Sequence, residues 1–218
     1  MDEIIKLIST YGLAIVISGL VLYFAIQFAH VFLEEYKQKR GIQHHDELHD
    51  IRAQVSSVIN ILLDRVLLKT RSDRVYVFEF HNGITSMGGL PFTKMSNTYE
   101  ALNEGTASEL HARENMPMSL YSSFMDGITC NDYIGLDIDD RRDAYSKLIY
   151  ETLVTRKVKV TLRAKITDIN KRIIGYVGLD YCREKPSDET LAQSIGILLD
   201  TATELGALLT VHNKKARF

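Results

Sequence analysis

The sequence contains little of what marks a disulfide-rich, disordered or nucleic-acid-binding protein. Its 218 residues include two cysteines and three prolines, and no tryptophan. Two cysteines are too few for a disulfide scaffold or a cysteine-rich zinc site, and Cys130 and Cys182 suit reduced thiols as well as one bridge. The formal net charge is only -2 at pH 7. No strong positive field therefore argues for nucleic acid as a partner.

Charge is also missing from one long interval near the amino end. No Asp, Glu, Lys or Arg occurs between Leu7 and Leu33, and the interval is apolar around the whole helix. A helix needs roughly 20 such residues to cross about 30 Å of hydrocarbon. A signal peptide has a basic start and a shorter apolar core, whereas this chain begins with Met1, Asp2 and Glu3. The sequence predicts a short tail at residues 1–10 and a transmembrane helix at 11–33.

Basic residues predict the orientation of this span. Lys6 alone precedes it, whereas Lys37, Lys39 and Arg40 follow it directly. Because basic residues favour the cytoplasmic side, we expect a single-pass protein of the inner (cytoplasmic) membrane with its C-terminal domain in the cytoplasm. The lipid bilayer is then its first partner.

Within the predicted span, small and polar residues recur at helical spacing. Small residues let helices approach closely, and polar ones hydrogen-bond between helices. The candidates for a membrane or oligomerisation contact are Ala14, Ser18, Ala25, Ala29, Gln27 and His30. We expect a homo-oligomer through the span and the following stalk. The alternative is that these are scattered small residues and interfacial polar groups.

The rest of the chain predicts an α+β protein. Residues 34–70 read as a juxtamembrane or stalk helix, because apolar residues recur at intervals of three and four. In the domain at 71–218, strands are predicted at 74–81 and 92–99, helices at 118–125, 141–153 and 188–212, and a hairpin at 158–182. A tight turn is expected at Asn82-Gly83. These elements together predict one antiparallel sheet flanked by terminal helices. In the hairpin a solvated basic face is predicted for Lys157, Lys159, Arg163 and Lys165.

This arrangement resembles the GAF/PAS-like sensory fold over residues 51–210, and "VYVFEFHNG" followed by "LPFTKMSNTYE" is similar to a pattern of phage and bacterial GAF-like proteins. The resemblance implies a sensory or regulatory domain. However, the Asn-Lys-Phe-Asp-Glu signature of cyclic-nucleotide-binding GAF domains is absent, and no cysteine stands in a bilin-attachment context. Neither ligand is implied, and no cofactor is expected.

The stretch "FEFHNG" supplies the candidate site. On a strand, Glu79 and His81 share one face near the strand end. A buried glutamate needs a partner, for which His81, Lys94 or Arg113 is available. The ligand-pocket candidates are Glu79, His81, Asn82, Lys94 and Arg113. Structural pairing and a ligand pocket both remain open, and catalysis is the weakest reading.

A second histidine-containing stretch, "HHDELHD", has zincin-like spacing between His45 and His49. Asp46 stands where that motif has its glutamate base, and no third ligand is evident. We therefore predict no metal site and no catalytic residue.

Two functions from different classes fit these features. The first is a membrane-anchored, non-catalytic regulatory or ligand-sensing module that acts through oligomerisation or partner binding. The second is a protein that forms lesions in the membrane. This reading rests on a resemblance to the T-even phage holin family, which lies in the short tail, the single span, the α+β domain and the stretch "FLEEYKQKR" after the span. That family exports its globular domain, so topology separates the two. An enzyme ranks last.

Overall fold

The computed structural model describes residues 2–85, 91–139 and 147–215 of the 218-residue chain. Contacts divide the chain into two units, residues 1–50 and 51–218, which are described separately. Within the described ranges the elements are α1 (Asp2–Thr70), β1 (Arg74–Thr85), β2 (Pro91–Leu102), η1 (His111–Arg113), β3 (Met116–Pro117), η2 (Met118–Tyr121), α2 (Ser122–Cys130), β4 (Tyr133–Asp137), α3 (Lys147–Thr155), β5 (Val160–Thr167), β6 (Ile173–Tyr181) and α4 (Asp188–Lys215).

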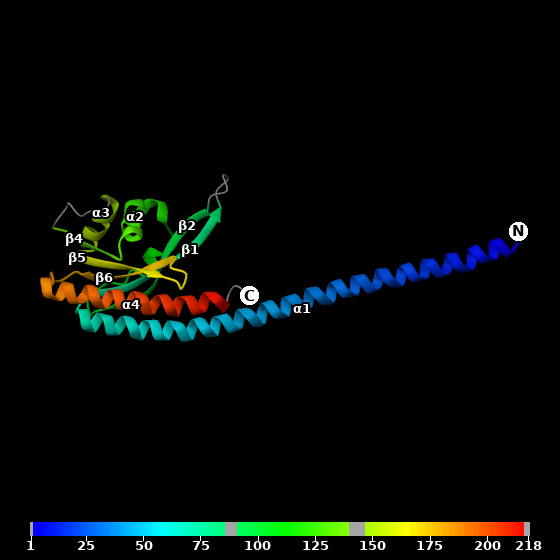
Figure 1. Cartoon of the computed structure of the whole chain (residues 1–218), viewed down its shortest axis with the longest axis horizontal. Helices are drawn as coiled ribbons and strands as arrows, with labels where there is room; N and C mark the ends of the chain where they lie inside the picture. Colours follow the sequence, from blue (N-terminus) through cyan, green and yellow to red (C-terminus); the bar gives the residue numbers. More distant parts are fainter. Residues whose placement is uncertain (1, 86–90, 140–146, 216–218) are drawn as a thin grey trace. The chain divides into compact units, whose positions relative to one another are not determined.

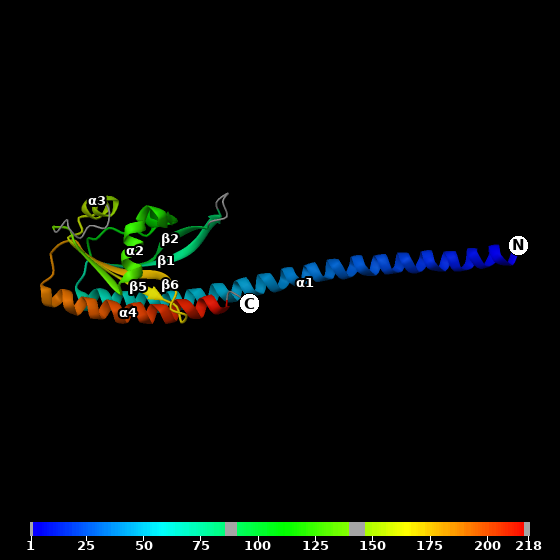
Figure 2. The same ribbon diagram turned by 45° about the horizontal axis from the view of Figure 1, so that its top comes forward.

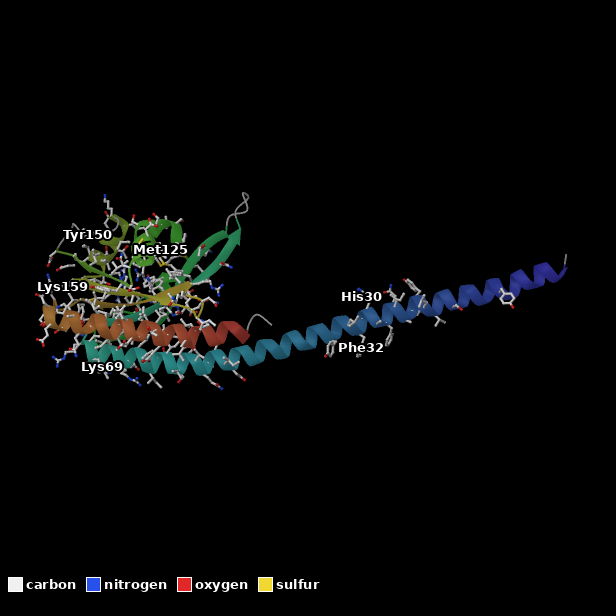
Figure 3. The ribbon with its side chains drawn as sticks, viewed as in Figure 1. His30, Phe32, Lys69, Met125, Tyr150 and Lys159 are labelled. Carbon is white, nitrogen blue, oxygen red and sulfur yellow. The ribbon has the colours of Figure 1, made fainter. Side chains whose placement is uncertain are left out.

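The first unit is helical over residues 2–50, as part of α1. His30 and Phe32 project from this helix (Figure 3) and are exposed. Ser18, Ala25, Gln27 and Ala29 are exposed as well, while the side chains of Ala14 and of the "HHDELHD" histidines lie outside the described residues. No helix within the described ranges combines enough length with enough hydropathy to cross a membrane. The span at 11–33 therefore stays a prediction.

The second unit is built on a six-stranded sheet with the order β3-β2-β1-β6-β5-β4, in which every neighbouring pair is antiparallel. The β5–β6 hairpin confirms the predicted one. The turn predicted at Asn82-Gly83 is wrong, because β1 continues to Thr85, which pairs with Pro91 of β2. Continued pairing with β2 satisfies the backbone there, so no turn is needed. The sequence analysis also missed β4.

One face of the sheet is covered by the two terminal helices. Residues 51–70 of α1 and α4 lie side by side along this face (Figures 1 and 2). Their apolar side chains at intervals of three and four meet the inward residues of β1, β5 and β6. The fully buried members include Ile59, Leu63, Val75, Val77, Leu179, Leu198 and Leu205. This layer confirms the predicted packing of terminal helices on the sheet.

The opposite face is covered by α2 and α3, which form a second layer (Figure 2). Met125 of α2 and Lys69 of α1 mark the two opposite layers in Figure 3. The basic face predicted for the hairpin is therefore only partly solvated: Lys157 and Lys159 are exposed, but Arg163 is 7% exposed. Lys165 is half-buried and pairs with Asp132 at 3.1 Å. The prediction failed because helices from the middle of the chain shield the central part of β5.

Candidate ligand-binding site

Aromatic side chains form the floor of the layer beneath α2. Strand alternation in β1 sends Tyr76 and Phe78 to this face, and both are fully buried. The Phe78 ring stacks on Tyr176 of β6 with centroids 4.8 Å apart, and Phe124 of α2 meets Tyr176 edge-on at 5.1 Å. These offset and edge contacts are the favourable geometries for aromatic pairs. The aromatic side chains of "VYVFEF" thus form part of the core.

Two arginines stand over this aromatic floor. The Arg113 guanidinium, from η1, lies 5.2 Å from the centroid of the Phe78 ring. The Arg163 guanidinium, from β5, lies 4.9 Å from the centroid of the Phe124 ring. Both distances are within the range of cation–π attraction, which gains strength where water is excluded. The site therefore combines apolar area with two buried positive charges.

A small enclosed cavity lies between these groups. Its volume is about 10 Å³, which is room for about one water molecule. Most of its lining is apolar, and the charged groups that reach it are the two arginines. The lining residues are Met95, Arg113, Met116, Tyr121, Phe124, Ile149, Thr152, Leu153, Arg163 and Tyr176. The lining has the composition of a small-molecule site, which is mostly apolar with a few convergent polar groups, but such sites usually measure about 300–1,000 Å³. A ligand larger than water must therefore widen this cavity.

Arg163 is held in place by one hydrogen bond, from its Nε to the Tyr76 hydroxyl at 3.1 Å. Among the described residues, no carboxylate lies within ion-pairing distance of it, and its terminal nitrogens make no hydrogen bond. Burial lowers the pKa of Arg163, but Tyr76, Tyr176 and the more distant Asp180 raise it, and the net pKa is above its ordinary value. The residue therefore stays charged at the cavity wall.

Behind this wall, Asp180 is the buried anion that organises the arginines. It is completely buried, and it accepts hydrogen bonds from Tyr76 at 3.2 Å and from Thr161 at 2.7 Å. Its carboxylate also lies 3.2 Å from Arg74 and 3.4 Å from Arg156. Burial raises the pKa of Asp180, but the nearby arginines and the Thr161 hydroxyl lower it more, so the net pKa is below its ordinary value. The carboxylate is thus ionised near neutral pH.

Two further titratable groups near the site are neutral. Burial raises the pKa of Tyr176 well above its ordinary value, although Arg163 and Arg113 oppose this rise. Its hydroxyl is therefore a neutral donor and acceptor at the cavity. Burial, with a contribution from Asp180, raises the pKa of Cys182 to about 11. Both cysteines are free thiols, and Cys182 is protonated, which makes it a poor nucleophile.

The residues proposed from "FEFHNG" lie elsewhere. Glu79 pairs with Arg52 of α1 at 3.3 Å, so the three partners suggested from the sequence are wrong. His81 Nε2 lies 2.9 Å from the Ser96 hydroxyl oxygen. Together with the exposed Asn82, these residues line an open groove of about 1070 Å³ at the far end of β1 and β2. This groove is open to solvent and its charged members are paired.

The other two sequence candidates separate from this group. Lys94 is half-buried and faces His81 across the β1–β2 pair, but it does not line the groove. Arg113 lines the enclosed cavity instead. Arg74, Arg156 and Asp180 are not among the residues predicted from the sequence, and Arg163 was predicted to lie on a solvated face. The available signal was charge beside apolar strand residues: Arg74 begins β1 before residues 75–78, and Asp180 follows residues 176–179 as the penultimate residue of β6.

Comparisons with known proteins show the fold. The chain is similar to a GAF domain from Synechocystis sp. PCC6803 in its photoproduct state, with a TM-score of 0.58 and 14% identity over 75% of this chain and 98% of that one. For the blue-light-absorbing form of the Thermosynechococcus elongatus PixJ GAF domain, the TM-score is 0.55 and the identity is 12%, over 76% of this chain and 93% of that one. For a phycocyanobilin-bound GAF domain from a cyanobacterial phytochrome, the TM-score is 0.55 and the identity is 16%, over 76% of this chain and 94% of that one.

These likenesses show a GAF-like fold and confirm the α+β, GAF-like part of the predicted fold class. They give no support to the resemblance to phage proteins or to holins. No protein-family model matches the sequence, and the search among curated proteins found no match.

Proposed function

We propose that this chain is a membrane-anchored, non-catalytic ligand-sensing module, and that its ligand binds in the cavity between the sheet and the α2–α3 layer. The observation that carries the proposal is Arg163, a buried cation that faces this cavity without a carboxylate among the described residues. A buried charge is costly unless it is paired. A bound ligand is the partner that the cavity lacks.

The surroundings favour recognition over chemistry. The nearest resemblance to a catalytic pair is His81 with Ser96, but the Ser96 oxygen also accepts the Asn115 backbone N–H at 2.8 Å. Glu79, the carboxylate nearest in sequence for orienting the histidine, is paired with Arg52. A nucleophile needs a base that is itself oriented by a third group. We therefore assign no catalytic residue.

The output of the module is association with a second copy through α1. Val58, Ile61 and Leu68 are 48%, 58% and 80% exposed, and they follow one another at spacings of three and seven residues. These three residues, called the α1 stripe below, lie on one helix face with the spacing of a coiled-coil seam. Toward the amino end, α1 runs on into the predicted span, so the same helix joins domain, anchor and oligomer contact. The domain faces the cytoplasm in this proposal.

A thermal-shift screen of full-length protein against a library of small molecules tests the proposal. The matched variants are Thr152→Trp, which puts an indole at the cavity wall, and Thr155→Trp, at an exposed position on the same helix. A ligand present at about a hundred times its Kd stabilises the folded state by roughly 2.7 kcal/mol. We expect such shifts for wild type and Thr155→Trp but not for a folded Thr152→Trp. Ligands that stabilise all three proteins equally would place binding outside the cavity.

A further inference from the structure

The carboxylate of Glu109 lies among three buried guanidinium groups. Its Oε1 is 3.2 Å from Arg74 Nη1 and also contacts Arg156 Nε, and its Oε2 is 3.5 Å from Arg113 Nε. The three arginine side chains are 3%, 9% and 10% exposed. One side chain on a connecting segment therefore serves as the shared anion of three arginines that come from β1, η1 and the end of α3.

The cluster holds more positive than negative charge. Its cations are Arg74, Arg113, Arg156 and Arg163, and its anions are Glu100, Glu109 and Asp180. Among the residues that the structure describes, four guanidinium groups against three carboxylates leave one positive charge in excess. Excess buried charge is unfavourable, so the cluster favours a ligand that brings more negative charge than the single Glu109 carboxylate that it replaces.

Hydrogen-bond donors within the cluster are also unsatisfied. Among the described residues, Arg156 Nη1 and Arg74 Nε are buried and have no hydrogen-bond acceptor. Arg74 Nε lies 3.2 Å from Glu100 but is not aligned for a hydrogen bond. Buried donors without acceptors are rare and unfavourable. An incoming anion with several oxygens supplies the missing acceptors.

Glu109 is free to leave without breaking the sheet. It lies between β2 and η1, outside helix and strand, and its backbone N–H is held by Glu100 at 3.0 Å. Withdrawal of the carboxylate therefore requires movement of its side chain or of this connecting segment, not of a strand. Arg113 contacts Glu109 and also lines the enclosed cavity, so this arginine connects the carboxylate to the candidate site.

We propose that the ligand carries a phosphate or carboxylate group, and that this group replaces the Glu109 carboxylate on Arg74, Arg113 and Arg156. The inference rests on the proposed function, because it names the ligand class of the same site. Guanidinium groups bind both kinds of anion with paired hydrogen bonds. The apolar part of the ligand lies over Tyr176 and Phe124. Release of Glu109 makes residues 103–110 more mobile, and this change in mobility signals that the ligand has bound.

The experiment uses full-length wild type, Glu109→Gln and the control Glu114→Gln. Glu114 is 53% exposed and pairs with His111 at the surface. Inorganic phosphate and benzoate are titrated against chloride at constant ionic strength, and the thermal unfolding midpoint gives the affinity. Glu109→Gln keeps the side-chain shape but removes the competing charge. We expect it to bind at least one of the two anions on the order of tenfold more tightly than wild type and Glu114→Gln do. Equal affinities for all three proteins would overturn the inference.

Two further measurements cover other outcomes. The double variant Glu109→Gln/Arg113→Gln is expected to lose the gain, and retention of the gain would contradict the role of Arg113. If Glu109→Gln does not fold, hydrogen exchange of wild type decides: either anion should speed exchange across residues 103–110, and unchanged exchange would overturn the inference. If a neutral ligand binds and Thr152→Trp blocks its binding, the inference of an anionic ligand is contradicted, but the proposed function is supported.

Discussion

The guanidinium of Arg163 lies over the ring of Phe124, 4.9 Å from its centroid, and joins the central sheet to α2. Nε of the same group donates to the Tyr76 hydroxyl, which in turn donates to the fully buried Asp180. A charge at the cavity is thus connected through one phenol to the anion that holds Arg74 and Arg156. The candidate site and the buried ion cluster are thus connected.

The position of Tyr76 depends on a glycine on the neighbouring strand. A Cβ at Gly178 would lie 2.5 Å from the Tyr76 ring, so Gly178→Ala must displace this ring. We expect a loss of about 1–3 kcal/mol in the free energy of unfolding, measured by urea denaturation.

The matched control is Gly196→Ala in α4, where a Cβ meets nothing within 4 Å. Alanine favours a helix over glycine by roughly 0.5–1 kcal/mol, so this variant should be more stable than wild type. Equal stability changes for the two substitutions would contradict the packing described for Tyr76.

Acid should destabilise the protein through Asp180. Its folded-state pKa lies below the ordinary 3.8, because the arginine charges outweigh burial. The stability that it contributes is therefore present above about pH 4 and is lost as the pH falls through the folded-state pKa. Asp180→Asn should cost roughly 3–5 kcal/mol at neutral pH, since it leaves buried arginines unpaired. It should also flatten the acid limb of the stability curve.

Urea denaturation of both proteins at a series of pH values from about 7 down to about 3 measures this effect. Asp200→Asn, at an exposed position of α4, is the control and should keep the wild-type profile. An acid limb of unchanged slope in Asp180→Asn would show that this carboxylate does not carry the pH dependence.

Association through the α1 stripe should depend on Leu68, which is 80% exposed. Burying a leucine side chain contributes about 1.5–3 kcal/mol, so Leu68→Lys should raise the dissociation constant by on the order of tenfold or more. Sedimentation of full-length protein in detergent measures it. Asn60→Lys, exposed on the same helix but outside the stripe, should leave association unchanged. A Leu68→Lys variant that associates like wild type would exclude this face as the contact.

Membrane anchoring and topology are tested by fractionation and by a reporter fused to the C-terminus. We expect the full-length protein in the membrane fraction and a reporter with cytoplasmic activity, because basic residues cluster after the predicted span. Activity of an export-dependent reporter would reverse the predicted orientation. Recovery of the protein in the supernatant without detergent would contradict the anchor itself.

Local patterns were sufficient to predict the aromatic strand and the terminal helices. Tyr76 and Phe78 alternate with aliphatic residues, and such alternation fixes which side chains share a face. It does not fix what covers that face. Arg163 alternates with apolar residues in the same way as a solvated lysine does, and only the packing of α2 makes it buried.

Long-range pairing explains the other differences. Glu79 pairs with Arg52, which lies 27 positions earlier in the chain and approaches only because α1 packs on the sheet. Likewise, Arg74 meets Asp180 across 106 positions. No local spacing contains such contacts, whereas the strand and helix periods that predicted the fold class are local.

The most direct test of ligand sensing is the set of small molecules that the immobilised full-length protein retains from a cell extract, identified by mass spectrometry. We expect wild type and Thr155→Trp to retain at least one compound, bearing a phosphate or carboxylate, that a folded Thr152→Trp does not retain. If all three proteins retain the same compounds in the same amounts, the cavity beside Arg163 is not a ligand site.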